Sequence, residues 1–118
     1  FDNGRLYAAS GFGNVVALDP ETGKMTEWDS PSGPDSHPYG INVMEGIVWY
    51  NESGVRPDVL VRFDPKTETF QSFPIKSGNV YAGIHRNGHV TRDGQSLLIH
   101  QSATNYVMKV TPRPPEVR

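Results

Sequence analysis

The strongest constraint on the fold of this 118-residue chain is that its sequence repeats. Residues 14–28 align without a gap with residues 59–73, at an offset of 45 residues. A third copy begins at Tyr106, 47 residues after the start of the second copy. Similarity at a nearly fixed period is typical of chains that fold as successive copies of one supersecondary unit.

Two further sequence elements recur in step with the first. Residues 4–10 are repeated at 46–52 and again at 95–101, and residues 39–43 are repeated at 87–91. A coincidental match inside another all-β sandwich is the alternative, but it does not account for three elements that keep their order and spacing. A period of about 45 residues is that of a four-stranded propeller blade.

Each repeat is predicted to consist of short strands joined by tight turns. Asp19-Pro20 and Asp64-Pro65 each follow an apolar strand, and Gly23 in the first turn is replaced by Glu68 in the second. Aspartate accepts hydrogen bonds from its own turn, proline presets φ, and glycine tolerates a positive φ. No segment has a sustained apolar period of 3.6 residues, so no helix is predicted.

The predicted strands are β-branched, aromatic and bounded by turn residues. They cover residues 5–10, 14–19, 24–29, 39–44, 47–51, 58–63, 69–74, 87–92, 96–100 and 105–110.

The sequence therefore predicts an all-β chain, a β-propeller fragment of about two and a half four-stranded antiparallel blades. The partial propeller covers residues 1–112, with repeats at roughly 4–46, 47–95 and 96–112, and a Pro-rich tail follows at 113–118. Closed propellers have about 4–8 blades, and an open arc exposes the apolar faces and strand edges of its end blades. We expect either that further sequence completes the ring or that copies of the chain associate to complete it.

The composition excludes several kinds of partner. The net charge is −2, and the 11 Lys and Arg residues are scattered, so no nucleic-acid partner is expected. No apolar stretch approaches the ~20 residues that span a bilayer, so no membrane insertion is expected. The absence of cysteine excludes disulfides and thiolate metal sites.

The order of motifs along the repeat matches one known family. A strand, a turn and a strand at 18–28 precede a Pro-rich loop at 30–36, then Pro38-Tyr39-Gly40-Ile41 and Val48-Trp49-Tyr50-Asn51-Glu52, with a second copy at 63–75. This repeat resembles that of the virginiamycin B lyase (streptogramin lyase) family over about residues 4–112. The resemblance implies a seven-bladed ring, an active site at one mouth of the central channel, and, as in many relatives, a secreted or periplasmic location.

The resemblance also implies a chemistry. Antibiotic-cleaving members share Glu-Pro-His-Gly-Ile, in which the Glu helps to hold Mg²⁺ and the His is the base of an elimination. In this chain His37 stands at the position of that Glu, and Tyr39 stands at the position of the His. Tyrosine has a solution pKa near 10 and is a poor base at neutral pH. Glu52 lies one position earlier than the family's second metal-binding Glu. We therefore predict that this segment alone is inactive as a lyase, and we assign it no metal ligands.

A polar ligand site is nevertheless predicted beside the channel mouth. In the next blade the motif has two alternative registers, 80–84 and 85–89, and the second makes His37 and His85 equivalent, 48 residues apart. Two neighbouring blades would then present imidazoles to one cavity. The candidate ligand-binding residues are His37, Tyr39, His85, Arg86, Asn87 and His89. The alternative is a pair of hydrogen-bonded loop histidines without a functional role. A metal site at His85 and His89 is disfavoured, because residues four apart on a strand are ~13 Å apart.

Two functions remain as hypotheses. One is metal-assisted elimination as in the streptogramin lyases, or the reaction of a related propeller lactonase or hydrolase. The other is a non-catalytic ligand-binding, scaffold or sensor propeller. The expected partners are a small-molecule ligand or the remaining blades.

Overall fold

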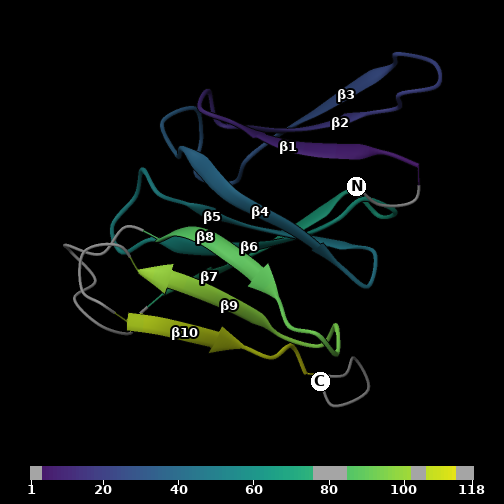
Figure 1. Ribbon diagram of the computed structural model, residues 1–118. Helices are drawn as coiled ribbons and strands as arrows, with labels where there is room; N and C mark the ends of the chain where they lie inside the picture. Colours follow the sequence, from purple (N-terminus) through teal and green to yellow (C-terminus); the bar gives the residue numbers. More distant parts are fainter. Residues whose placement is uncertain (1–3, 76–84, 102–105, 114–118) are drawn as a thin grey trace.

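The computed structural model describes residues 4–75, 85–101 and 106–113, which form ten strands and no helix (Figure 1). The strands make three antiparallel sheets in which strands that follow one another along the chain are neighbours. The prediction of an all-β chain is therefore confirmed. None of the described residues belongs to a helix that could cross a membrane.

The first sheet contains β1 (Leu6–Ser10), β2 (Asn14–Leu18) and β3 (Met25–Asp29). The second contains β4 (Pro38–Met44), β5 (Ile47–Glu52), β6 (Val59–Asp64) and β7 (Thr69–Pro74). The third contains β8 (His85–Val90), β9 (Leu97–Gln101) and β10 (Tyr106–Val110). Every predicted strand is present, with ends that differ from the prediction by two residues at most.

The sheets and the sequence repeats are offset by one strand. The first repeat, at 4–46, includes the three strands of the first sheet and also β4. β4 pairs with β5 rather than with β1, through a tight hairpin in which Met44 is opposite Ile47. The second sheet therefore spans 38–74, and the third spans 85–110 among the described residues.

The two Asp-Pro turns have the same geometry. The Asp19 Oδ1 atom accepts a hydrogen bond from the Glu21 N–H at 2.9 Å, and the Asp64 Oδ1 atom accepts one from the Lys66 N–H at 3.0 Å. The Gly23 N–H donates to the Asp19 carbonyl at 2.7 Å. Glu68 makes the equivalent bond to the Asp64 carbonyl at 2.8 Å, so the turns are structural repeats as well as sequence repeats.

The second sheet is buried on both faces. One face packs against the first sheet, where Val15 joins a buried cluster with Val48 and Phe63. The other face packs against the third sheet, where Trp49 and Leu60 join a second cluster. The second cluster also contains Leu97 and Ile99.

Equivalent positions of successive sheets face the same way. Val15 and Leu60 are related by the 45-residue repeat, and each packs toward the sheet that follows its own. Trp28 and Phe73 are also related by the repeat, but their ring contacts differ: the Trp28 ring lies 4.8 Å from Phe63 of the second sheet, whereas the Phe73 ring lies 6.4 Å from Trp49 of its own sheet. The apolar packing of β2 is therefore repeated in β6, while the aromatic contact is not.

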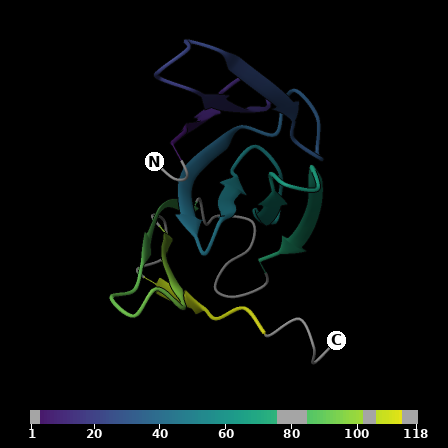
Figure 2. The same cartoon turned by 90° about the vertical axis from the view of Figure 1, so that its right-hand side faces the viewer.

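The first strands of the sheets gather on one side of the molecule. β4 contacts β1 on one flank and β8 on the other. In the side view the later strands of each sheet fan away from this side (Figure 2). β4 and β8 run in the same direction and begin at the same end of the molecule (Figure 1).

Candidate ligand-binding end

The predicted site residues of the second sheet lie at the end where β4 and β8 begin (Figure 1). Three connections meet there: the β1–β2 turn at 11–13, the β3–β4 loop at 30–37 and the β5–β6 loop at 53–58. We call this the His37 end.

Glu52, the last residue of β5, fixes the β3–β4 loop by accepting hydrogen bonds from it. Its side chain has no exposed surface. The Ser30 Oγ–H donates to its Oε2 atom at 2.5 Å, and the Ser32 Oγ–H donates to its Oε1 atom at 2.7 Å. The Ser32 backbone N–H also donates to Oε2, at 3.1 Å. A buried carboxyl group needs such partners to offset the loss of its hydration.

Tyr50 completes this polar cluster. Its hydroxyl lies 2.7 Å from the Ser30 Oγ atom, and its side chain is almost fully buried. Burial raises the pKa of Tyr50 well above its ordinary value; the hydrogen bond to Ser30 offsets part of the rise, and the charge of Glu52 adds to it. The hydroxyl therefore keeps its proton at neutral pH and serves as a structural group.

Two glycines allow neighbouring segments of the chain to approach the β3–β4 loop closely. A Cβ atom on Gly13 would lie 2.6 Å from the Gly33 carbonyl oxygen, and one on Gly54 would lie 2.1 Å from the Asp35 carbonyl oxygen. The Gly54 N–H donates to the Ser36 carbonyl at 2.8 Å. The loop is thus clamped between the β1–β2 and β5–β6 connections as well as tied to Glu52.

His37 is presented by this clamped loop with its side chain exposed. Its φ is 52°, and its carbonyl accepts hydrogen bonds from the Ser53 N–H and Oγ–H, both at 3.0 Å. A left-handed conformation is uncommon outside glycine, although histidine is enriched among the exceptions. A Cβ atom on Gly11 would lie 3.8 Å from the His37 Cε1 atom, so the imidazole stands beside the β1–β2 turn.

Tyr39 lies two residues further on, at an irregularity of β4. The β4–β5 register shifts between Pro38 and Ile41. The buried Asn51 side chain supports the irregular stretch by accepting a hydrogen bond from the Gly40 N–H at 2.8 Å. Tyr39 is 47% exposed. His37 and Tyr39 therefore share an accessible edge at the start of β4.

The strand pairing gives a third register for the next copy of the motif. Pro38 is opposite Glu52, and His85 is opposite Gln101, the equivalent of Glu52. His85 is therefore level with Pro38, and the position equivalent to His37 is residue 84, outside the described residues. The register that equates His37 with His85 differs from the pairing by one residue.

The hairpins explain this difference. The β4–β5 hairpin turns through Glu45 and Gly46, whereas the β8–β9 hairpin turns through residues 92–95, after the Thr91 N–H bonds the Ser96 carbonyl at 2.9 Å. The two extra residues change the repeat offset from 47 before the hairpin to 49 after it. The offset of 48 residues that equates His37 with His85 therefore matches neither the strand before the hairpin nor the strand after it.

The other predicted site residues fall on β8. The side chains of His85, Arg86 and Asn87 lie outside the described part of the structure. His89 is exposed and level with Asn42, because His89 is opposite Leu98 as Asn42 is opposite Trp49. The structure thus brings the backbones of 37–39 and 85–87 to one end of two adjacent strands.

The described residues do not fit the magnesium site that the family resemblance implies. Glu52 is the carboxylate nearest to the family's second metal-binding position, and both of its oxygens already accept hydrogen bonds from the loop. Within 4–75, 85–101 and 106–113 no group of three or more His, Asp or Glu side chains is placed to hold a metal ion. We derive no reaction step through a metal.

The sequence prediction missed the Ser30–Ser32–Tyr50–Glu52 cluster. The available signal was an ionisable residue, Glu52, directly after the predicted strand 47–51, which is mostly apolar and aromatic. Such a residue needs hydrogen-bond donors, and the loop before β4 is rich in serine, which can supply them.

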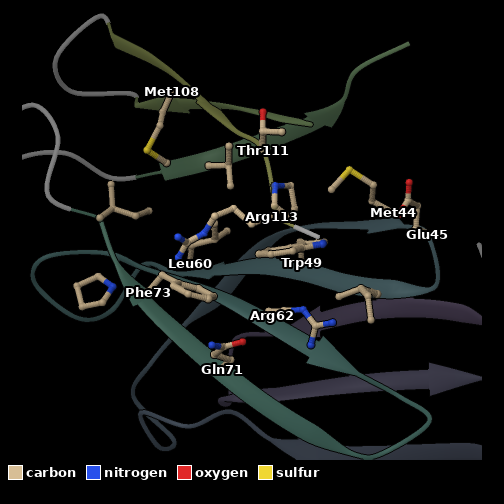
Figure 3. A pocket seen from close by; sticks show the side chains of 15 residues that line it. Met44, Glu45, Trp49, Leu60, Arg62, Gln71, Phe73, Met108, Thr111 and Arg113 are labelled. Atoms are coloured by element: carbon tan, nitrogen blue, oxygen red, sulfur yellow. The ribbon is translucent and has the colours of Figure 1, made fainter. Parts of the chain in front are cut away.

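A groove lies apart from the His37 end, between the second and third sheets (Figure 3). Its volume is about 690 Å³, and it shares no residue with the predicted site. Trp49, Leu60 and Phe73 line it from the second sheet, and Met108 and Val110 line it from the third. The lining is mainly apolar.

Comparison with models of known protein families and with the curated proteins gives no match. The class that the structure defines is thus an all-β chain of consecutive, mutually packed antiparallel sheets.

Proposed function

We propose that the three sheets are consecutive blades of a β-propeller and that the chain is a ligand-binding module whose His37 end receives a polar small molecule. The buried, fully engaged Glu52 carries this proposal. Its carboxylate shapes the loop that presents His37 instead of facing a substrate.

The exposed end faces support the propeller arrangement. On the first sheet, Leu6 and Met25 are 44% and 62% exposed, and their repeat equivalents in the second sheet are Val48 and Phe70, which pack against the first sheet. On the third sheet, Leu98 and Val107 are 38% and 67% exposed, and their equivalents are Trp49 and Leu60, which pack against the third sheet. Each end sheet therefore exposes a face whose repeat equivalent in the second sheet is buried against a neighbouring sheet.

The preformed geometry of the His37 end supports binding. The loop is fixed by buried hydrogen bonds and glycine contacts, so presenting the imidazole and the phenol of Tyr39 requires little ordering when a ligand arrives. Irregular strand starts and loops on a rigid sheet are common places for ligand sites.

The binding test uses a streptogramin B antibiotic as the probe, because the sequence resembles that of the streptogramin lyases. We expect saturable shifts in amide NMR spectra at residues 36–41 and 53–54. His37→Asn keeps a residue that tolerates positive φ, and we expect it to weaken binding at least fivefold with an unchanged melting temperature. Equal affinity for the variant, or shifts confined to other regions, would contradict the proposal.

Elimination is the second candidate, favoured by the Pro38-Tyr39-Gly40-Ile41 stretch at this end. It is tested by following linearisation of the same antibiotic with Mg²⁺ by chromatography. We expect no turnover by the 118 residues. Turnover that is lost in Tyr39→Phe would assign the chain to the lyases instead.

A further inference from the structure

We propose that Arg56, in the β5–β6 loop, is a binding point for the carboxylate group of a small molecule. The inference goes beyond the function proposed for the His37 end, because it does not require His37 or Tyr39 to contact the same ligand. It rests on the way in which the loop uses only one of the three nitrogen atoms of the guanidinium group.

One nitrogen of the Arg56 guanidinium makes all the hydrogen bonds that join this side chain to the described residues. The Nη1 atom donates to the Ser53 carbonyl at 2.7 Å, to the Val55 carbonyl at 2.8 Å and to the Asp58 Oδ1 atom at 3.0 Å. Since Nη1 carries two protons, three acceptors use it fully. The Nε and Nη2 atoms donate to no residue in the described part of the chain.

These contacts fix the guanidinium group of Arg56 and leave its other edge accessible. The Asp58 side chain has no exposed surface, whereas 36% of the Arg56 side-chain surface is exposed. An arginine that is already ordered loses less conformational entropy on binding a ligand than a freely moving one does. The edge formed by Nε and Nη2 is therefore preorganised for an acceptor from outside the loop.

The geometry of this edge selects a carboxylate. The Nε–H bond and one Nη2–H bond are parallel and lie in one plane, so they match the two oxygen atoms of a planar carboxylate. Asp58 balances the charge of Arg56, and Asp35 adds a further carboxylate on the neighbouring loop, whose backbone lies against Gly54. Because these groups add negative charge around the site, a singly charged acceptor is favoured over a doubly charged phosphate.

The loop that carries Arg56 is longer in the second sheet than in the first. Three residues, 11–13, connect β1 and β2, whereas six residues, 53–58, connect β5 and β6. Loops that extend from a rigid sheet commonly carry binding residues. Ser53, whose carbonyl holds Arg56, also donates its N–H to the His37 carbonyl at 3.0 Å, so the proposed site lies at the His37 end.

The test follows the side-chain Nε–H signals of arginine by NMR while sodium acetate replaces sodium chloride at constant ionic strength. Acetate is the probe because it presents a carboxylate with little else. We expect a saturable shift of the Arg56 signal. Arg92, which is exposed in the turn between β8 and β9, is an internal control whose signal should show no saturable shift.

A variant that conserves charge separates the planar donor edge from the charge itself. Arg56→Lys keeps the positive charge but loses the two parallel donors, so we expect it to bind acetate at least fivefold more weakly, as measured from the amide signals of residues 53–58. Arg92→Lys is the matched control and should leave the affinity unchanged. His37→Asn should change it less than twofold, and a larger loss would overturn the separation from the site proposed at His37.

The comparison of the Arg56 and Arg92 signals uses the unmodified chain, so it remains decisive should Arg56→Lys fail to fold. A shift at Arg56 that does not saturate, an equal response at Arg92, or unchanged affinity in a folded Arg56→Lys would overturn the proposal. Tighter binding of inorganic phosphate than of acetate would overturn the assignment to carboxylates.

Discussion

Glu52 has no exposed surface, and both of its carboxylate oxygens accept hydrogen bonds from the loop that precedes β4. The loop contributes two serine hydroxyls and one backbone N–H, and the Ser30 hydroxyl also lies 2.7 Å from the Tyr50 hydroxyl. Removing the carboxylate would break three hydrogen bonds and leave the buried Ser30 hydroxyl with Tyr50 as its remaining side-chain partner. Hydrogen bonds to a charged group contribute more than neutral ones.

We predict that Glu52→Ala lowers the free energy of unfolding by about 3 kcal/mol, because the change opens a small cavity and removes three hydrogen bonds to a buried carboxylate. Urea denaturation followed by circular dichroism measures this loss. The control is Glu27→Ala on β3, where the glutamate is exposed and the change should stay within about 0.5 kcal/mol. A loss below about 1 kcal/mol for Glu52→Ala would show that the loop is held by its glycine contacts instead.

From the sequence, His37 and Tyr39 could be placed at the start of the first strand of a sheet. The residue that is equivalent to His37 in the next sheet could not be assigned correctly. Strand assignment depends on local alternation, whereas equivalence between strands depends on the length of the hairpin that joins them. The two extra residues at 92–95 change that length, and no residue type in the turn fixes in advance where a register moves.

The two Asp-Pro turns have different residues at the position that requires a positive φ. Gly23 and Glu68 are equivalent, with φ values of 75° and 57°. Glycine adopts this conformation without a steric cost, while a residue with a Cβ atom pays about 1 kcal/mol or more. The second turn keeps both hydrogen bonds that Asp64 accepts, from the Lys66 and Glu68 N–H groups, despite this cost.

We predict that Glu68→Gly raises the free energy of unfolding by about 0.5–1 kcal/mol, since relief of the left-handed conformation exceeds the extra entropy of glycine in the unfolded chain. The reciprocal change, Gly23→Ala, should lower it by about 1 kcal/mol, even though a Cβ atom there would meet nothing within 4 Å. Thermal unfolding of both variants checks the pair. Opposite signs are expected, and a destabilising Glu68→Gly would mean that the glutamate side chain stabilises the turn.

The strands themselves were predictable because each is specified locally. β2 and β6 are short, mostly apolar runs that are followed by Asp-Pro turns, and both features act within a few residues. The groove was not predictable, because it depends on which strands of the third sheet cover Phe73, and that is a property of two sheets together. The Glu52 cluster joins residues about 20 apart and was missed for a similar reason.

The molecule as a whole has two different apolar ends. The first sheet exposes Leu6 and Met25, while the third exposes Leu98 and Val107. Among the described residues, Val48 and Phe70, the equivalents of the first pair, pack with Val15 of the first sheet, and Leu97 packs with Trp49 and Leu60, the equivalents of the second pair. The two ends are therefore complementary to each other and not to themselves, so contact between copies would be head-to-tail, the geometry that produces rings or filaments.

This asymmetry makes self-association testable by mixing two variants. We expect the mass of the chain in sedimentation to rise with concentration, because both end faces lose apolar exposure on contact. Met25→Lys should block the face of the first sheet, and Val107→Lys should block that of the third. Each variant then keeps only one of the two complementary faces, so each should stay monomeric by itself. An equimolar mixture should form pairs, because the intact third-sheet face of Met25→Lys meets the intact first-sheet face of Val107→Lys. A mixture that stays monomeric while the unmodified chain associates, or a single variant that still dimerises, would mean that the copies meet through another surface.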